Sequence, residues 1–170
     1  MGVCLLSYDE LQRRLILSFQ DYLDYRKSAA NKKVTEHFTL FDIVNSNTAI
    51  VKKIDNRPTT QVITNATLLI KNVLEPLRIH FNSPLNVNCM YRSPLLNKAV
   101  GGVATSQHCT GQAADITITN HTIEEIFNYI KHSMIFDQVI QEGTWIHVSF
   151  NAVHNRKQSL RLVNGKYIAA

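Results

Sequence analysis

The chain has 170 residues, 45% of them hydrophobic and 18% charged, which is the composition of one globular domain large enough to bury a core. Eighteen basic and thirteen acidic residues give a net charge of +5, which favours anionic partners. The basic residues occur at most in pairs and are not interleaved with aromatic residues, so direct nucleic-acid binding is not predicted.

The sequence predicts neither a membrane span nor a secretion signal. No apolar run approaches the ~20 residues that cross a bilayer. Residues 1–6 are apolar, but they lack a basic segment and a cleavage site, and Asp9 and Glu10 follow them closely. The three cysteines are an odd and widely spaced set, which is typical of a protein made in a reducing cytoplasm.

A helix over about residues 8–26 is predicted at the N-terminus. Ser7 and Glu10 have the spacing of a capping box, and apolar residues then recur at helical intervals. Residues 28–33 are small and polar and indicate a linker. We therefore divide the chain into an N-terminal helix with its linker (1–33), which packs on the main domain or serves a partner, and the main domain (34–170).

The first part of the main domain is predicted to be helical. Thr39 is placed to cap a short helix. An apolar stripe from Val62 to Leu77 indicates a longer helix, and Pro76 should kink or loosen its last turn because proline cannot donate to the Asn72 carbonyl. Ser93 followed by Pro94 is typical of another helix start, and Gly101 ends the segment.

The second part of the chain is predicted to be mostly strands. Alternating residues indicate strands over 85–90, 114–119, 136–141 and 145–150, and a final hairpin over 159–169 turns at Asn164-Gly165. Thr122 and Glu125 form a capping box for one further helix. The predicted fold class is α+β: a single domain with helices packed on a small, mostly antiparallel sheet, plus the extra N-terminal helix.

Three residues suggest a zinc site. His108 and Asp115 are seven residues apart, and the small residues between them allow a loop and a strand to converge. His147 lies on a later strand, where it shares one face with Trp145 and Ser149. Two imidazoles and one carboxylate suit zinc, and three protein ligands leave a fourth position open to water, as in catalytic sites.

These residues belong to a wider pattern that resembles a known family. The pattern is Ser106-x-His108-x-x-Gly111-x-Ala113-x-Asp115 followed by Trp145-x-His147-x-Ser149, with supporting likeness at residues 37–40, 72–78, 91–97 and 136–138. It resembles the zinc D-alanyl-D-alanine carboxypeptidase family, which also includes peptidoglycan endopeptidases and phage endolysins. The resemblance implies the Hedgehog/D-Ala-D-Ala peptidase-like fold, zinc as cofactor, and His108, Asp115 and His147 as its ligands.

The resemblance also implies that Arg92 binds substrate or stabilises the developing oxyanion. A general base is needed as well, and in much of the family it is an acidic residue three positions before the last histidine. Thr144 occupies that position here. Glu142, across the predicted turn, is therefore the first candidate for the base and Asp137 the second.

Further cleft residues are open to two interpretations each. Trp145 forms a wall of the substrate cleft or simply packs. Ser106 and Ser149 orient the substrate or the residues that support the metal ligands, or they only make loop hydrogen bonds. Cys109 beside His108 invites a cysteine-peptidase interpretation, which we do not favour because the flanking pattern assigns His108 to metal.

The function expected from this pattern is hydrolysis of peptide bonds in peptidoglycan stem peptides by a zinc enzyme. Whether it is a carboxypeptidase or an endopeptidase stays open. A phage lysin, made without a signal peptide and acting at the bacterial wall after release or in a virion, fits best. The alternative is a non-catalytic virion or wall-binding module, and a virion partner could bind the N-terminal helix.

Overall fold

The structure of this protein is a computed structural model that describes residues 7–170. Residues 1–6, which contain Cys4 and the apolar stretch used to judge the secretion signal, lie outside the described residues. In the part of the chain that the structure describes, no helix combines the length and apolar character needed to cross a bilayer.

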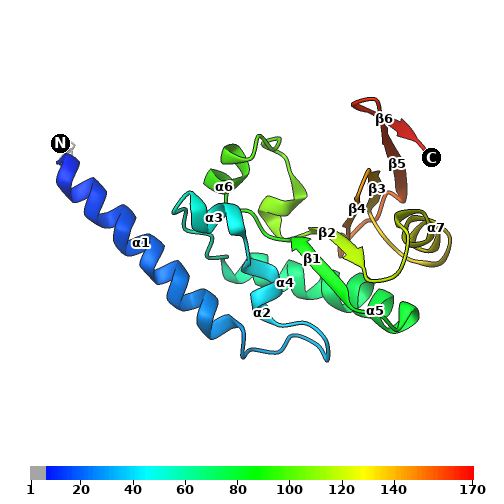
Figure 1. Cartoon of the computed structure of the whole chain (residues 1–170), viewed down its shortest axis with the longest axis horizontal. Helices are drawn as coiled ribbons and strands as arrows, with labels where there is room; N and C mark the ends of the chain where they lie inside the picture. The colour runs from blue at the N-terminus through cyan, green and yellow to red at the C-terminus, as the bar shows by residue number, and fades with distance from the viewer. Residues whose placement is uncertain (1–6) are drawn as a thin grey trace.

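The first helix, α1 (Tyr8–Ala29), begins as predicted, with the Ser7 hydroxyl accepting the Glu10 amide. The Glu10 carboxylate binds Arg14 rather than completing a capping box. The helix runs three residues further than predicted, and its first half projects away from the body of the molecule (Figure 1). Its second half is part of the common core, because Tyr22 and Ala29 are fully buried there.

Helices form most of the layer between α1 and the sheet. Thr39 caps α2 as predicted, with Asp42 completing a capping box. The elements are α2 (Leu40–Val44), α3 (Asn47–Val51), α4 (Thr60–Leu69), the π-helical η1 (Ile70–Leu74), α5 (Glu75–Phe81) and α6 (Pro94–Ala99). The π-helical turn directly precedes Pro76: the Glu75 amide bonds back to the Ile70 carbonyl, which loosens the helix where Pro76 cannot donate. The predicted irregularity is therefore present.

A six-stranded sheet in the order β1-β2-β4-β3-β5-β6 forms the rest of the domain. The strands are β1 (Leu85–Cys89), β2 (Ala113–Ile118), β3 (Gln138–Glu142), β4 (Trp145–Ser149), β5 (Gln158–Val163) and β6 (Lys166–Ala169). Within this sheet β3 and β5 pair in parallel and the other neighbours are antiparallel. The α+β fold with a mostly antiparallel sheet is therefore confirmed.

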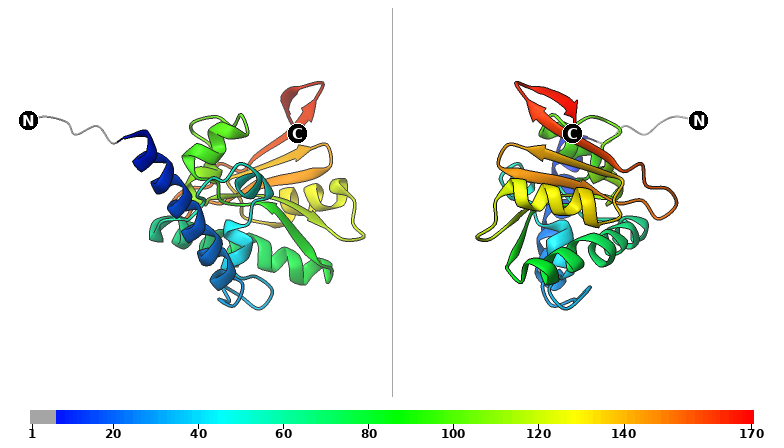
Figure 2. Two further views of the ribbon diagram at one scale, coloured as in Figure 1. Left: turned by 60° about the vertical axis from the view of Figure 1, so that its left-hand side comes forward. Right: turned by 90° about the vertical axis from the view of Figure 1, so that its right-hand side faces the viewer.

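The two faces of the sheet have different surroundings. Helix α7 (Ile123–Ser133) lies across β3 and β4 (Figure 2), and Ile146 and Val148 are fully buried on that side. The opposite face carries a row of directly paired residues across β2, β4, β3 and β5, namely Asp115, His147, Ile140 and Leu160. One face thus builds the core, and the other is available for a site.

The burial of Tyr22 gives the first testable prediction. Its ring lies in the core and its hydroxyl donates to the Val44 carbonyl at 2.9 Å, whereas Leu15, on the same helix, is 58% exposed. Tyr22→Ala should lower the free energy of unfolding by about 3–5 kcal/mol, as for other large buried aromatics. Leu15→Ala is the matched control and should change it by less than about 0.5 kcal/mol. Urea unfolding followed by circular dichroism measures both, and equal effects would mean that α1 does not share the core.

Candidate metal site and cleft

Strand pairing brings the first two predicted ligands together. Asp115 on β2 stands directly opposite His147 on β4, and Nδ1 of His147 lies 3.0 Å from Oδ1 of Asp115. Both strands alternate as their sequences predicted, so that neighbouring apolar residues enter the core while these two side chains face away from it.

His108 completes the group from a separate element, the 3-10 helix η2 (Gln107–Thr110). Its Nε2 lies 3.2 Å from Nδ1 of His147 and 3.3 Å from Oδ1 of Asp115. A tetrahedral zinc ion with bonds of about 2.0–2.1 Å separates its ligand atoms by about 3.3–3.4 Å. The three atoms therefore have the mutual spacing that zinc requires, within a few tenths of an ångström.

The protonation of His108 also suits a metal. Burial lowers its pKa, so the ring is neutral at pH 7. Its Nδ1 lies 2.7 Å from the Met90 carbonyl, which can only accept a hydrogen bond. The proton is therefore on Nδ1, and Nε2 presents its lone pair to the other two ligand atoms.

Asp115 is ionised beside these rings. Burial by itself raises the pKa of its carboxyl group, but hydrogen bonds and charge from His108 and His147 outweigh that effect when their facing nitrogens carry a proton, and the net shift is downward. A metal ion would take the place of those protons. The site therefore offers one negative charge and two imidazole nitrogens, a donor set that fits zinc.

Cys89 offers an alternative third ligand. It pairs with Asp115 across β1 and β2, its sulfur lies 4.0 Å from Nδ1 of His108, and the ligand atoms of these three residues lie within 4.8 Å of one another. We favour the set with His147, because its atoms are closer together and Nδ1 of His108 is already bonded to Met90. Burial raises the pKa of the Cys89 thiol to about 12, so an ion that binds there would have to displace its proton.

The backbone can bring η2 to this place because the residues around Gly111 are small. Gly111 has a φ of 72°, and a Cβ atom there would lie 2.6 Å from the Val62 carbonyl oxygen of α4. The Asn65 side chain also donates to the Thr110 carbonyl at 2.9 Å. The backbone of this stretch therefore approaches its neighbours closely, as predicted, and these contacts hold the end of η2 against α4.

The three candidate ligands line a cleft of about 930 Å³ on the open face of the sheet. Arg92 lines it too, held by a backbone hydrogen bond from its amide to the His108 carbonyl at 3.2 Å. Nε of Arg92 is buried and has no hydrogen-bond partner among the described residues. The guanidinium of Arg92 places a positive charge at the wall of the cleft, so this end of the cleft suits an anionic group.

Glu142 and Asp137 are the two candidates for the general base, and the surroundings of their carboxylates differ. Glu142 lines the cleft beside Trp145, its cross-strand partner, and receives a hydrogen bond from the Tyr167 hydroxyl at 3.3 Å. Asp137 is 3% exposed, and hydrogen bonds from Arg156 hold its pKa well below its usual range. A strongly paired carboxylate is a poor proton acceptor, so Glu142 is the better candidate.

The predicted substrate-binding residues separate into two groups. Ser106, Trp145 and Arg92 all line the cleft. Ser149 is fully buried, and its hydroxyl accepts the Gln138 amide at 3.0 Å. The prediction that Ser149 contacts substrate is therefore wrong: it shares the face of His147, but the start of β3 covers it.

Several cleft residues were not foreseen from the sequence. They come from η2, from the loop after β4 and from the final hairpin: Gln107, Asn151, His154, Arg156, Leu160 and Tyr167. No local pattern marks them, because loop and hairpin residues join the cleft only through the order of strands in the sheet.

The comparisons with known proteins agree with this geometry. A model of the family described as Peptidase M15 matches residues 36–149, more than half of the chain, and the match includes all three predicted ligands, Arg92 and Glu142. A search of curated proteins found no match. The chain therefore belongs to the Peptidase M15 family of zinc metallopeptidases.

Proposed function

We propose that the protein is a zinc-dependent peptidase that cleaves peptide bonds in bacterial peptidoglycan stem peptides. The observation that carries the proposal is the convergence of His108 Nε2, Asp115 Oδ1 and His147 Nδ1 at 3.0–3.3 Å along one cleft. The substrate and the setting, a phage lysin acting at the bacterial wall after release or in a virion, rest on the resemblance of the sequence motifs. The virion partner of α1 stays a prediction.

The charges of the site support hydrolysis of an amide. His108, Asp115 and His147 would hold the ion, and a neutral–neutral–anionic ligand set leaves a divalent cation with a net charge of +1. When bound, zinc activates water as a nucleophile and polarises the scissile carbonyl. Arg92 adds a second positive charge that can bind a substrate carboxylate or the oxyanion that develops in the transition state.

Glu142 supplies the proton transfer in this proposal. It accepts a proton from the attacking water and passes it to the leaving amine, as a general base and then an acid. The hydrogen bond from Tyr167 fixes one carboxylate oxygen and leaves the other free for this transfer. Trp145, beside Glu142, forms the adjoining wall of the cleft.

The substrate is tested by incubating the zinc-loaded protein with purified peptidoglycan and analysing the products by mass spectrometry. We expect soluble products with newly formed stem-peptide ends. Release of free D-alanine identifies a carboxypeptidase, and cut stems or cross-bridges identify an endopeptidase. Zinc-loaded protein that releases no product would contradict the proposal and favour a non-catalytic wall-binding module.

The role of Glu142 is tested by Glu142→Gln, which keeps the shape of the side chain but cannot accept a proton. Turnover should fall by about 10²–10⁴-fold, the usual contribution of general acid–base catalysis, while zinc stays bound at one equivalent. His108→Ala provides the contrast, since it should lose both zinc and turnover. Retained turnover in Glu142→Gln would remove Glu142 from the mechanism.

A further inference from the structure

A buried carboxylate, Asp137, collects hydrogen bonds from two distant parts of the chain. Its Oδ1 accepts from the amide and from Nε of Arg156, at 3.0 and 2.9 Å, and its Oδ2 accepts from Nη2 of Arg156. Oδ2 also accepts from Nε2 of Gln107 at 2.9 Å. Both carboxylate oxygens are therefore satisfied, and Asp137 joins β3, η2 and the loop after β4.

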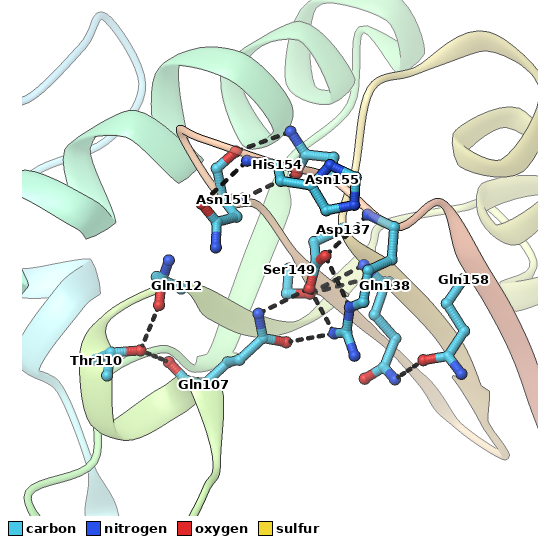
Figure 3. A network of polar contacts seen from close by, with 11 residues as sticks. Gln107, Thr110, Gln112, Asp137, Gln138, Ser149, Asn151, His154, Asn155 and Gln158 are labelled. Carbon is cyan, nitrogen blue, oxygen red and sulfur yellow. Dashed lines mark hydrogen bonds and ion pairs between the residues drawn. The ribbon is translucent and has the colours of Figure 1, made fainter.

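This network reaches His108 through Gln107. Gln107 immediately precedes His108 in η2, and its carboxamide is held at both ends, because Nε2 donates to Asp137 and Oε1 accepts from Arg156 at 3.4 Å. Figure 3 shows the Gln107 side chain extended from η2 toward Asp137. The position of His108 along η2 thus depends on contacts that lie outside the metal ligands themselves.

The same network reaches His147 through Ser149. The Asp137 amide donates to the Ser149 carbonyl at 2.8 Å, two residues beyond His147 on β4, and the Ser149 hydroxyl accepts the next amide, of Gln138 (Figure 3). Asp137 is therefore the point at which the two histidine-bearing segments, η2 and β4, are joined by hydrogen bonds.

Arg156 is the cation that makes this junction favourable. A carboxylate as buried as Asp137 would be strongly destabilised without a charged partner. The loop that carries Arg156 is closed by reciprocal hydrogen bonds between Asn151 and Asn155, at 2.9 and 2.8 Å (Figure 3). The guanidinium is therefore presented in a fixed position. Arg156 also lies beyond residues 36–149, the part of the chain that matches the family.

We propose that Arg156 is a positioning residue for the metal site: it holds the Asp137 carboxylate, which fixes Gln107, against a backbone that is paired with Ser149, and it thereby sets the spacing between His108 and His147. The proposal rests on the zinc site of the proposed function. Loss of Arg156 leaves Asp137 without its main partner and frees Gln107, so that His108 moves relative to β4 and the zinc site loosens. Residues that orient ligands in this way commonly contribute 10- to 100-fold, roughly, to metal affinity.

The test measures the zinc dissociation constant of the full chain by competition with a chromophoric chelator. Arg156→Gln should weaken zinc binding by roughly 10- to 100-fold. The matched control is Arg161→Gln, which removes another two-bond arginine–carboxylate pair, with Glu124 of α7, that does not include a cleft residue. This control should bind zinc as the wild type does. Equal affinities for the wild type and Arg156→Gln would overturn the proposal.

A second variant covers the case in which Arg156→Gln does not fold. Gln107→Leu keeps the Arg156–Asp137 pair and removes only the link to η2, so it should also weaken zinc binding, with a thermal stability close to that of the wild type. Wild-type affinity in Gln107→Leu would contradict the proposed path to His108. A wild-type protein that binds no zinc would instead refute the proposed function, which makes the two failures distinguishable.

Discussion

The pairing of β2 with β4 is the constraint on which the candidate site depends. It sets Asp115 opposite His147, and in the same register it sets Ile116 opposite Ile146 and Ala114 opposite Val148. Because side chains alternate along a strand, a slip of either strand by one residue would turn its candidate ligand into the core and expose its own apolar residues. The burial of the apolar residues on one face of these strands therefore fixes the positions of Asp115 and His147 on the other face. No further contact is needed to hold these two residues side by side.

Arg156 and Arg92 both line the cleft, but their guanidinium groups have different partners. The guanidinium of Arg156 is paired with the buried carboxylate of Asp137, which in turn contacts η2 and β4. Arg92 lines the cleft with a buried Nε that no described residue satisfies. The first stabilises the protein and the second is available to a ligand, although both occupy loops next to strands.

The sequence predicted the parts of this architecture that depend on local patterns. Alternation identified the strands of Asp115 and His147, capping residues marked the starts of α1, α2, α6 and α7, and Pro76 located an irregular helical turn. Local sequence patterns did not predict the contacts between segments that are distant in the chain. The role of Arg156, the nearness of Cys89 to the ligands and the covering of Ser149 all follow from strand order and loop packing. Most of the fold was therefore predictable, but the residues that support and surround the site were not.

The central claim is the identity of the metal ligands, and X-ray absorption at the zinc edge tests it most directly. The zinc-loaded protein should show a shell of nitrogen and oxygen atoms at about 2.0–2.1 Å, from His108, Asp115, His147 and solvent. The matched variant Cys89→Ser should give the same spectrum. A sulfur atom at about 2.3 Å in the wild type, lost in Cys89→Ser, would show that Cys89 binds the ion and would contradict the account.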